Sequence, residues 1–182
     1  ELMKMGEPGV PEMNAYIEEV LKEGETLGFD GRVVSVGEGE GYAAIAGKKN
    51  AKVNYQVDLI DEIWEDRPVL SEEPAFNLDV KYAGETVASK LARIREEMKE
   101  AGTNVHVVST IDDICWTLNI RGNDIDFFPL VLSYGIITMY SFELYIDEKK
   151  LDDKLKAKLE KDGVNLHPYN DIYEDVKKFG SD

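Results

Sequence analysis

The side chains best suited to chemistry in this sequence include a pair of closely spaced carboxylates. Asp124 and Asp126 form a D-x-D pair, which in an extended segment places both carboxylates on one side of the chain. Paired carboxylates of this kind bind Mg²⁺ or Mn²⁺. The pair also follows Gly122 and Asn123, so the alternative is an Asx-rich loop, because Asp and Asn accept turn conformations. The pattern favours the loop over the metal site.

Two histidines are the other candidate ligands. His106 lies in a run of valines, and His167 lies beside a proline. A metal site needs several converging ligands, and neither histidine has a sequence neighbour that supplies one. A lone histidine in such surroundings is more often a core or surface residue than a ligand. A weaker hypothesis joins His106 with Asp124 and Asp126 as a hydrolytic centre.

The remaining candidates for catalysis or phosphate binding have structural interpretations. Cys115 is expected on an apolar helical face beside Trp116, which predicts a protonated packing thiol and not a nucleophile. No serine or histidine lies in a nucleophile setting such as G-x-S-x-G. The Gly-Glu-Gly-Glu-Gly run at 37–41 lacks the P-loop lysine, and its glutamates would repel phosphate. The run predicts a flexible turn.

Composition narrows the classes of partner. The 182 residues include 21 Lys+Arg and 37 Asp+Glu, a net charge of −16, and 43% are hydrophobic. The chain is therefore globular, while nucleic acid and anionic membrane surfaces are poor partners. No apolar run approaches the roughly 20 residues of a membrane span. The single cysteine fits a reducing, cytoplasmic compartment. Because residue 1 is Glu, we expect the chain to have been cut from a longer one.

Hydrophobic periodicity predicts alternating helices and strands. In the first part we expect a helix from Pro11 to Gly24, a helix at 39–48 and a short helix capped by Asp58. Strands are expected at 26–29, 32–36 and 52–57. Two prolines and clustered charge make 65–74 a linker.

The second part is predicted by stronger patterns. Its helices are expected at 85–101, from a capping box at Thr110, at 151–163, and after a cap at Asn170. Strands are expected at 105–109 and 164–167, with two antiparallel strands within 130–147. This alternation favours a layered α/β fold.

One stretch is distinctive. Residues 110–124 read Thr-Ile-Asp-Asp-Ile-Cys-Trp-Thr-Leu-Asn-Ile-Arg-Gly-Asn-Asp, and 128–134 read Phe-Pro-Leu-Val-Leu-Ser-Tyr. This closely resembles the second N-terminal domain of three-domain aminopeptidases P (X-Pro aminopeptidases), relatives of prolidase and creatinase. The family reads T-x-L-D-x-I-A-W-x-x-N-x-R-G-x-D, then N-P-V-x-x-S-Y. Asn119, Arg121 and Asp124 keep the pattern, whereas Phe128 stands where the family often has Asn.

The resemblance extends over almost the whole chain. Residues 2–6 and 28–30 look like the end of the family's first domain, and 54–68 like the passage into the second. Tyr82-Ala-Gly84, with Lys90 and Arg95, matches the second domain's opening helix, and His167-Pro-Tyr169 matches its closing strand. The resemblance therefore implies that 1–68 is the C-terminal portion of the first domain and 69–182 the second domain. The implied fold is a three-layer ribonuclease-H-like α/β fold with a mixed sheet.

The resemblance also implies a function. In the family, two Asp, one His and two Glu of a C-terminal pita-bread domain hold two divalent ions, typically Mn²⁺, and that domain is absent from these residues. We therefore expect no catalytic or metal-binding residue here; Asp124-x-Asp126 lies in the wrong domain to be the family's metal-binding D-x-D. The implied role, in a cytosolic enzyme, is to gate and position proline-containing peptides beside its own catalytic domain and to assemble a homo-oligomer.

Three residues are the substrate-proximal candidates: Arg121, Asn119 and Asp124. A guanidinium in a Gly-Asn loop can bind a carbonyl or carboxylate, so Arg121 is the first choice. The alternative is a structural ion pair between Arg121 and Asp124 or Asp126. The alternative function is a stand-alone acidic α/β binding module without peptidase activity.

Overall fold

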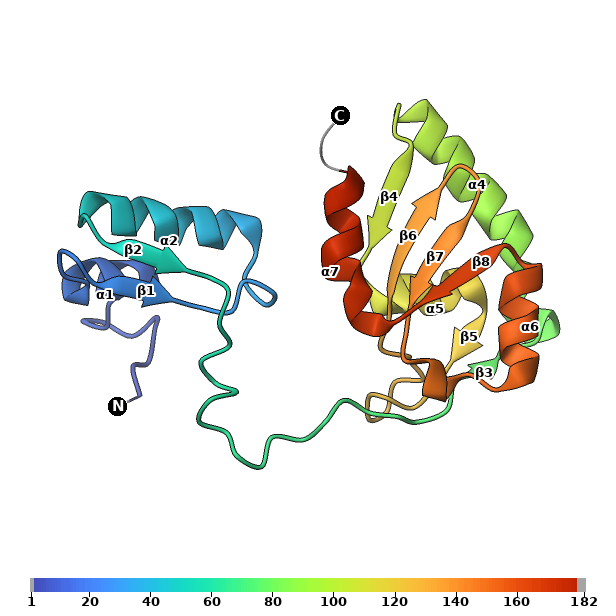
Figure 1. Ribbon diagram of the computed structural model, residues 1–182, viewed down its shortest axis with the longest axis horizontal. Helices are drawn as coiled ribbons and strands as arrows, with labels where there is room; N and C mark the ends of the chain where they lie inside the picture. Colours follow the sequence, from blue (N-terminus) through green and yellow to red (C-terminus); the bar gives the residue numbers. More distant parts are fainter. Residues whose placement is uncertain (1, 180–182) are drawn as a thin grey trace. The chain divides into compact units, whose positions relative to one another are not determined.

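The computed structural model of the chain describes residues 2–179. Contacts within the chain divide it into two compact units, Glu1–Val69 and Leu70–Asp182 (Figure 1). None of the described helices is long and apolar enough to cross a membrane.

The first unit is a small β-α-β arrangement. Its elements are α1 (Met13–Val20), β1 (Thr26–Gly28), α2 (Val36–Lys48) and β2 (Lys52–Asn54). Strands β1 and β2 pair in parallel, and α2 supplies the crossover that a parallel pair requires. The buried cluster beneath them consists of Leu21, Ile45 and Ala46. The unit therefore rests on few buried side chains.

The glycine-rich run corrects one prediction. Residues 37–41 lie inside α2 and do not form a flexible turn. The Ser35 hydroxyl accepts a hydrogen bond from the Glu38 amide, and the Glu38 carboxylate accepts one from the Ser35 amide. This capping box starts the helix despite the glycines, and burial of Tyr42 and Ile45 on the same helix holds it.

Two further predictions for the first unit are wrong. No strand forms at 32–36, because Ser35 and Val36 begin α2. No helix follows Asp58. The Asp58 carboxylate does accept hydrogen bonds from the amides of Ile60 and Asp61, but the chain there forms only turns, and the predicted linker at 65–74 has no regular structure.

The second unit is built on a four-stranded mixed sheet. Its strands are β4 (Val105–Val108), β6 (Tyr134–Thr138), β7 (Phe142–Tyr145) and β8 (Val164–His167), in the order β4-β6-β7-β8. The first two pairings are antiparallel, and β7 and β8 pair in parallel. A separate antiparallel pair joins β3 (Phe76–Asn77) to β5 (Ile120–Arg121).

Helices cover both faces of this sheet (Figure 1). The helices of the second unit are α3 (Val80–Ala83), α4 (Val87–Glu100), α5 (Ile111–Leu118), α6 (Asp153–Lys161) and α7 (Ile172–Asp175), with 3-10 turns at Glu148–Lys150, Tyr169–Asp171 and Val176–Phe179. Helices follow Thr110 and Asn170 as predicted, but neither residue caps its helix in the predicted way. Thr110 precedes α5 without a side-chain cap bond, and Asn170 lies in a 3-10 turn before α7.

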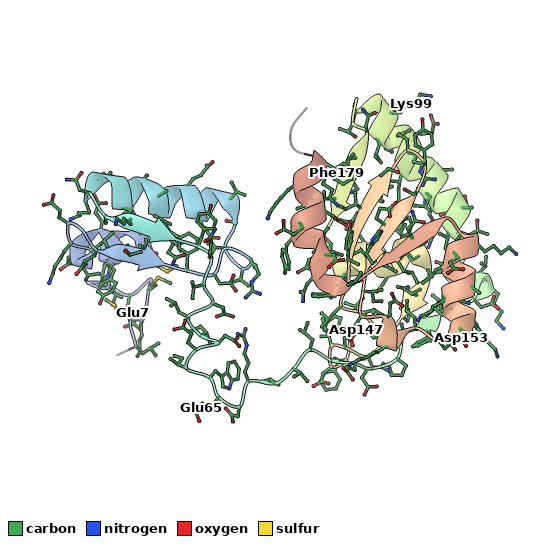
Figure 2. The ribbon with its side chains drawn as sticks, in the orientation of Figure 1. Glu7, Glu65, Lys99, Asp147, Asp153 and Phe179 are labelled. Carbon is green, nitrogen blue, oxygen red and sulfur yellow. The ribbon has the colours of Figure 1, made fainter. Side chains whose placement is uncertain are left out.

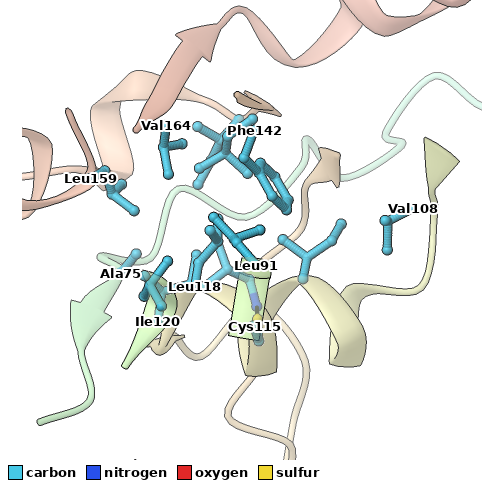
Figure 3. Close-up of a cluster of buried hydrophobic side chains, with 14 of the residues drawn as sticks. Ala75, Leu91, Val108, Cys115, Leu118, Ile120, Phe142, Leu159 and Val164 are labelled. Atoms are coloured by element: carbon cyan, nitrogen blue, oxygen red, sulfur yellow. Dashed lines mark hydrogen bonds between the residues drawn. The ribbon is translucent and has the colours of Figure 1, made fainter. Parts of the chain in front are cut away.

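Alternating side chains give the sheet two buried faces. Phe142 and Val164 join the larger core with Leu91 of α4 and Leu118 of α5, all labelled in Figure 3. On the opposite face, Tyr145 packs in a smaller cluster that includes α7. Because neighbouring residues of a strand point to opposite faces, one strand serves both layers. The expected three-layer α/β fold with a mixed sheet is confirmed.

Candidate functional site

Asn119 ends α5 and connects it to the start of α4. It is 1% exposed and adopts a left-handed conformation at φ 53°, which Asn tolerates better than most residues. Its Oδ1 accepts a hydrogen bond from Lys90 Nζ at 2.7 Å, and its Nδ2 donates to the Glu85 carbonyl at 2.8 Å. The side chain is therefore fully used within the fold.

Lys90 is the buried cation of this network. Its Nζ donates to the Trp116 carbonyl at 2.6 Å and lies 4.3 Å from the centroid of the Trp116 ring. Burial lowers the pKa of the Lys90 ammonium. The carbonyl, the Asn119 amide and the indole face together replace the water that the ammonium loses on folding.

Glu85 forms the exposed side of the network and gives a pH prediction. Hydrogen bonds from Arg93 and then from Ser89 lower the pKa of Glu85 from 4.5 to about 2. The charged form is favoured in the folded chain, so its contribution to stability is present above pH 4.5 and is lost as pH falls towards 2. An NMR titration should show this low pKa, and Arg93→Ala should raise it. An unchanged pKa in that variant would contradict the assignment.

Arg121 lies on β5 and is half-buried. Its Nη1 donates to the carbonyls of Cys115 and Ile120, each at 2.7 Å. The alternative predicted for Arg121, an ion pair with Asp124 or Asp126, is not formed in the described part of the chain, where Asp124 pairs with Lys150 instead. Within residues 2–179, Nε and Nη2 of Arg121 make no hydrogen bond. Nη1 of the guanidinium thus stabilises the fold, while Nε and Nη2 are available to bind another group.

Asp124 closes the loop that follows β5. Its side chain is 1% exposed and pairs with Lys150, whose side chain is 2% exposed. The same oxygen, Oδ2, accepts a hydrogen bond from the Leu132 amide at 2.7 Å. Its other oxygen, Oδ1, is buried and has no hydrogen-bond partner in the described residues. The pair ties the loop to the segment that follows β7.

The carboxylates of the D-x-D pair therefore differ in environment. The Asp124 carboxylate is buried, whereas Asp126 is exposed. Among residues 2–179, no group of three or more His, Cys, Asp and Glu side chains is arranged to hold a metal ion. Both residues lie in the loop after β5, and Asp124 has a structural partner, Lys150, that the sequence did not indicate.

Both histidines lie on strands and not in this loop. His106 is exposed on β4. His167 Nε2 lies 2.7 Å from the Glu143 carboxylate and its ring stacks on Tyr145 with centroids 4.9 Å apart. This contact joins β8 to β7, which agrees with a structural role for His167.

Cys115 gives a prediction about reactivity. The thiol is 1% exposed, its Sγ accepts a hydrogen bond from the Val131 amide, and burial raises its pKa. Since the thiolate is the reactive form, we expect alkylation by iodoacetamide to be at least about 100-fold slower in the folded chain than in denaturant. Mass spectrometry over time measures both rates. Similar rates in the two states would contradict a buried thiol.

Residues 125–129 form a loop with exposed aromatic side chains, which the sequence analysis did not predict. Phe127 is fully exposed, Phe128 is 60% exposed and Ile125 is 37% exposed. The sequence signal for this loop was the pair of aromatic residues before Pro129. A residue before a proline is restricted to extended conformations, which indicates that Phe128 does not lie in a helix.

A cleft lies at the carboxyl ends of β7 and β8. It has a volume of about 540 Å³, and Asp147, labelled in Figure 2, is among its lining residues. Lys150 and Leu132 also line it, so the cleft adjoins the buried pair that Lys150 forms with Asp124. Ligands of open α/β sheets bind at such strand ends.

Comparison with known proteins gives consistent results. The chain is 36% identical over 178 residues to Aminopeptidase P2 of Arabidopsis thaliana, covering 96% of this chain and 25% of that protein. It is 34% identical over 174 residues to Xaa-Pro aminopeptidase app-1 of Caenorhabditis elegans, covering 95% of this chain and 28% of that protein. The chain therefore spans about a quarter of the relatives' length.

A solved structure agrees with these relatives. The X-prolyl aminopeptidase of Caenorhabditis elegans, described as a cytosolic enzyme with a di-nuclear active site, matches with a TM-score of 0.88 and 33% identity. The match covers 98% of this chain and 29% of that one. The creatinase/prolidase N-terminal domain family matches residues 66–182. Since this match covers the whole of the second unit and more than half of the chain, the chain belongs to the creatinase/prolidase N-terminal domain family.

Proposed function

We propose that this chain is the N-terminal, non-catalytic part of a longer cytoplasmic X-Pro aminopeptidase. The observation that carries the proposal is the match of 98% of the chain to only 29% of a solved X-prolyl aminopeptidase. In this proposal, residues 1–68 complete a first domain, residues 69–182 form the second, and a third domain outside the chain holds two divalent ions, taken to be Mn²⁺.

The proposed role is positioning, not chemistry. The chain gates the approach of proline-containing peptides and contributes to assembly of a homo-oligomer, while the catalytic domain removes the residue before proline. Rigid positioning of a substrate lowers the entropic part of the barrier. The rigid attachment of Arg121 and Asp124 to the fold supports this role.

Sequencing the coding DNA beyond Asp182 tests the proposal first. A continuous reading frame with two Asp, one His and two Glu as metal ligands is the expected result. The protein expressed from that frame should cleave X-Pro peptides and lose activity with a chelator, whereas the 182-residue chain alone should be inactive. A stop codon directly after Asp182 would overturn the proposal.

Arg121→Lys tests substrate proximity in the longer enzyme. Lysine keeps the charge but lacks the second edge of the guanidinium, which makes no bond within the described fold. We expect kcat/KM for an X-Pro peptide to fall about tenfold, with a change in unfolding free energy within about 1 kcal/mol. Arg93→Lys, on the exposed face of α4, is the matched control. Unchanged kinetics would remove Arg121 from the site.

The cleft favours the second candidate function, a stand-alone binding module. Its volume of about 540 Å³ is in the range of small-molecule sites. This candidate predicts a stop codon after Asp182 and a ligand whose binding is lost on substitution of Asp147, which lines the cleft. An intact peptidase reading frame would contradict it.

A further inference from the structure

The loop 125–129, here named the aromatic tip, exposes more apolar surface than the fold requires. The side chain of Phe127 is fully exposed, and that of Phe128 is 60% exposed. Isolated exposed apolar residues are ordinary, but adjacent exposed aromatic residues mark contact surfaces.

The backbone of the tip is also strained. Phe127 adopts φ 68°, the left-handed region that disfavours a residue with a bulky side chain by about five- to thirtyfold. The Phe127 side chain is fully exposed, so within the described residues no packing of the ring offsets this cost. Strain at an exposed aromatic residue points to a contact made outside these residues.

The base of the tip is held firmly. Asp124 at its start is paired with Lys150. The Gly122 amide donates to the Pro129 carbonyl at 3.4 Å, and the Phe128 amide donates to the Ile125 carbonyl at 3.1 Å. A firmly held loop loses little conformational entropy when it binds.

Charge and chain length indicate which surface the aromatic tip contacts. The tip borders an open hollow of about 360 Å³ whose lining residues include Asp126, Phe127 and Phe128, and the whole chain carries −16. A matching surface is therefore apolar with a basic rim, and a second copy of this acidic chain is disfavoured. The solved relative has 71% of its chain (100% − 29%) outside the match.

Resting on the proposed function, we propose that the aromatic tip docks into an apolar, basic-rimmed pocket on the remainder of the longer aminopeptidase polypeptide. Phe127 and Phe128 enter the pocket, and Asp126 faces its basic rim. The docking fixes the second unit against the catalytic part through two adjacent side chains.

Photo-crosslinking identifies the occupant. The full-length protein is prepared with p-benzoylphenylalanine in place of Phe127 and irradiated, and the crosslinked peptides are mapped. Tyr140 is the matched control, because it is 94% exposed but lies in the turn between β6 and β7. The expected result is a crosslink from position 127, and none from 140, to residues outside 1–182 of the polypeptide. No crosslink, a crosslink to residues 1–182 of another copy, or one only to added peptide substrate would overturn the proposal.

The variant Phe127→Asn adds a measurement that does not depend on crosslinking. Asn accepts the left-handed conformation, so the unfolding equilibrium constant of the 182-residue chain should stay the same or fall by up to about tenfold. In the full-length protein, amide exchange at 126–128 should become at least about tenfold faster than in the parent. Equal exchange rates in both proteins would overturn the docking.

The two proposals fail differently. A full-length protein that shows the crosslink but does not cleave X-Pro peptides disproves the proposed function and keeps the docking. An active full-length enzyme without the crosslink disproves the docking and keeps the proposed function.

Discussion

Lys150→Met should lower the free energy of unfolding by about 3–5 kcal/mol, because it leaves a buried carboxylate without its cation. The Asp124 and Lys150 side chains are 1% and 2% exposed, so water cannot replace the lost partner. The Leu132 amide would remain the only donor to Asp124 in the described fold. Urea denaturation followed by circular dichroism measures the change.

A neighbouring lysine provides the control for this prediction. Lys149 pairs with Glu72 at the surface, where both side chains are more than half exposed. Lys149→Met should therefore change the unfolding free energy by less than about 1 kcal/mol. The double variant Asp124→Asn with Lys150→Met should recover part of the loss, since it removes the uncompensated charge. Equal losses for the two lysine variants would show that burial of the pair does not matter.

Asn119→Ala should cost about 2–4 kcal/mol of unfolding free energy. Alanine at φ 53° is strained by about 1 kcal/mol or more, and the change removes the hydrogen bonds to Lys90 and to the Glu85 carbonyl. A buried ammonium that loses an acceptor accounts for the larger share. The same urea denaturation experiment measures it.

Asn119→Gly separates the two causes. Glycine accepts the left-handed backbone but makes neither side-chain hydrogen bond. We expect it to lose about 1 kcal/mol less than Asn119→Ala, while still losing more than an exposed substitution does. If the two variants were equally stable, the backbone conformation would contribute nothing. If both cost under about 1 kcal/mol, the network around Lys90 would not stabilise the fold.

Much of the second unit could be predicted from local patterns. The apolar residues of α4 recur every three or four positions, and Gly102 follows its end. The β-branched and aromatic run at 130–147 predicted two antiparallel strands, and the structure has β6 and β7 paired in this way. These signals are strong because they depend only on residues close together in the sequence.

The partners of the candidate residues could not be predicted in the same way. Lys150 lies 26 residues from Asp124, and Lys90 lies 29 residues from Asn119. Such contacts form only when the sheet and helices are assembled, so no local spacing indicates them. Helix α2 was misjudged at its start for a different reason: the Ser35–Glu38 capping box outweighed the low helix propensity of the glycines.

Helix α2 also has a consequence for local opening of the chain. It contains four glycines, Gly37, Gly39, Gly41 and Gly47, and each is about 1 kcal/mol less favourable in a helix interior than alanine. Its unit has a buried cluster of 3 residues, against 18 in the main cluster of the second unit. The first unit therefore has much less buried apolar packing than the second to oppose local opening, and its amides should exchange faster than those of β6 and β7. A contact with another body would slow that exchange.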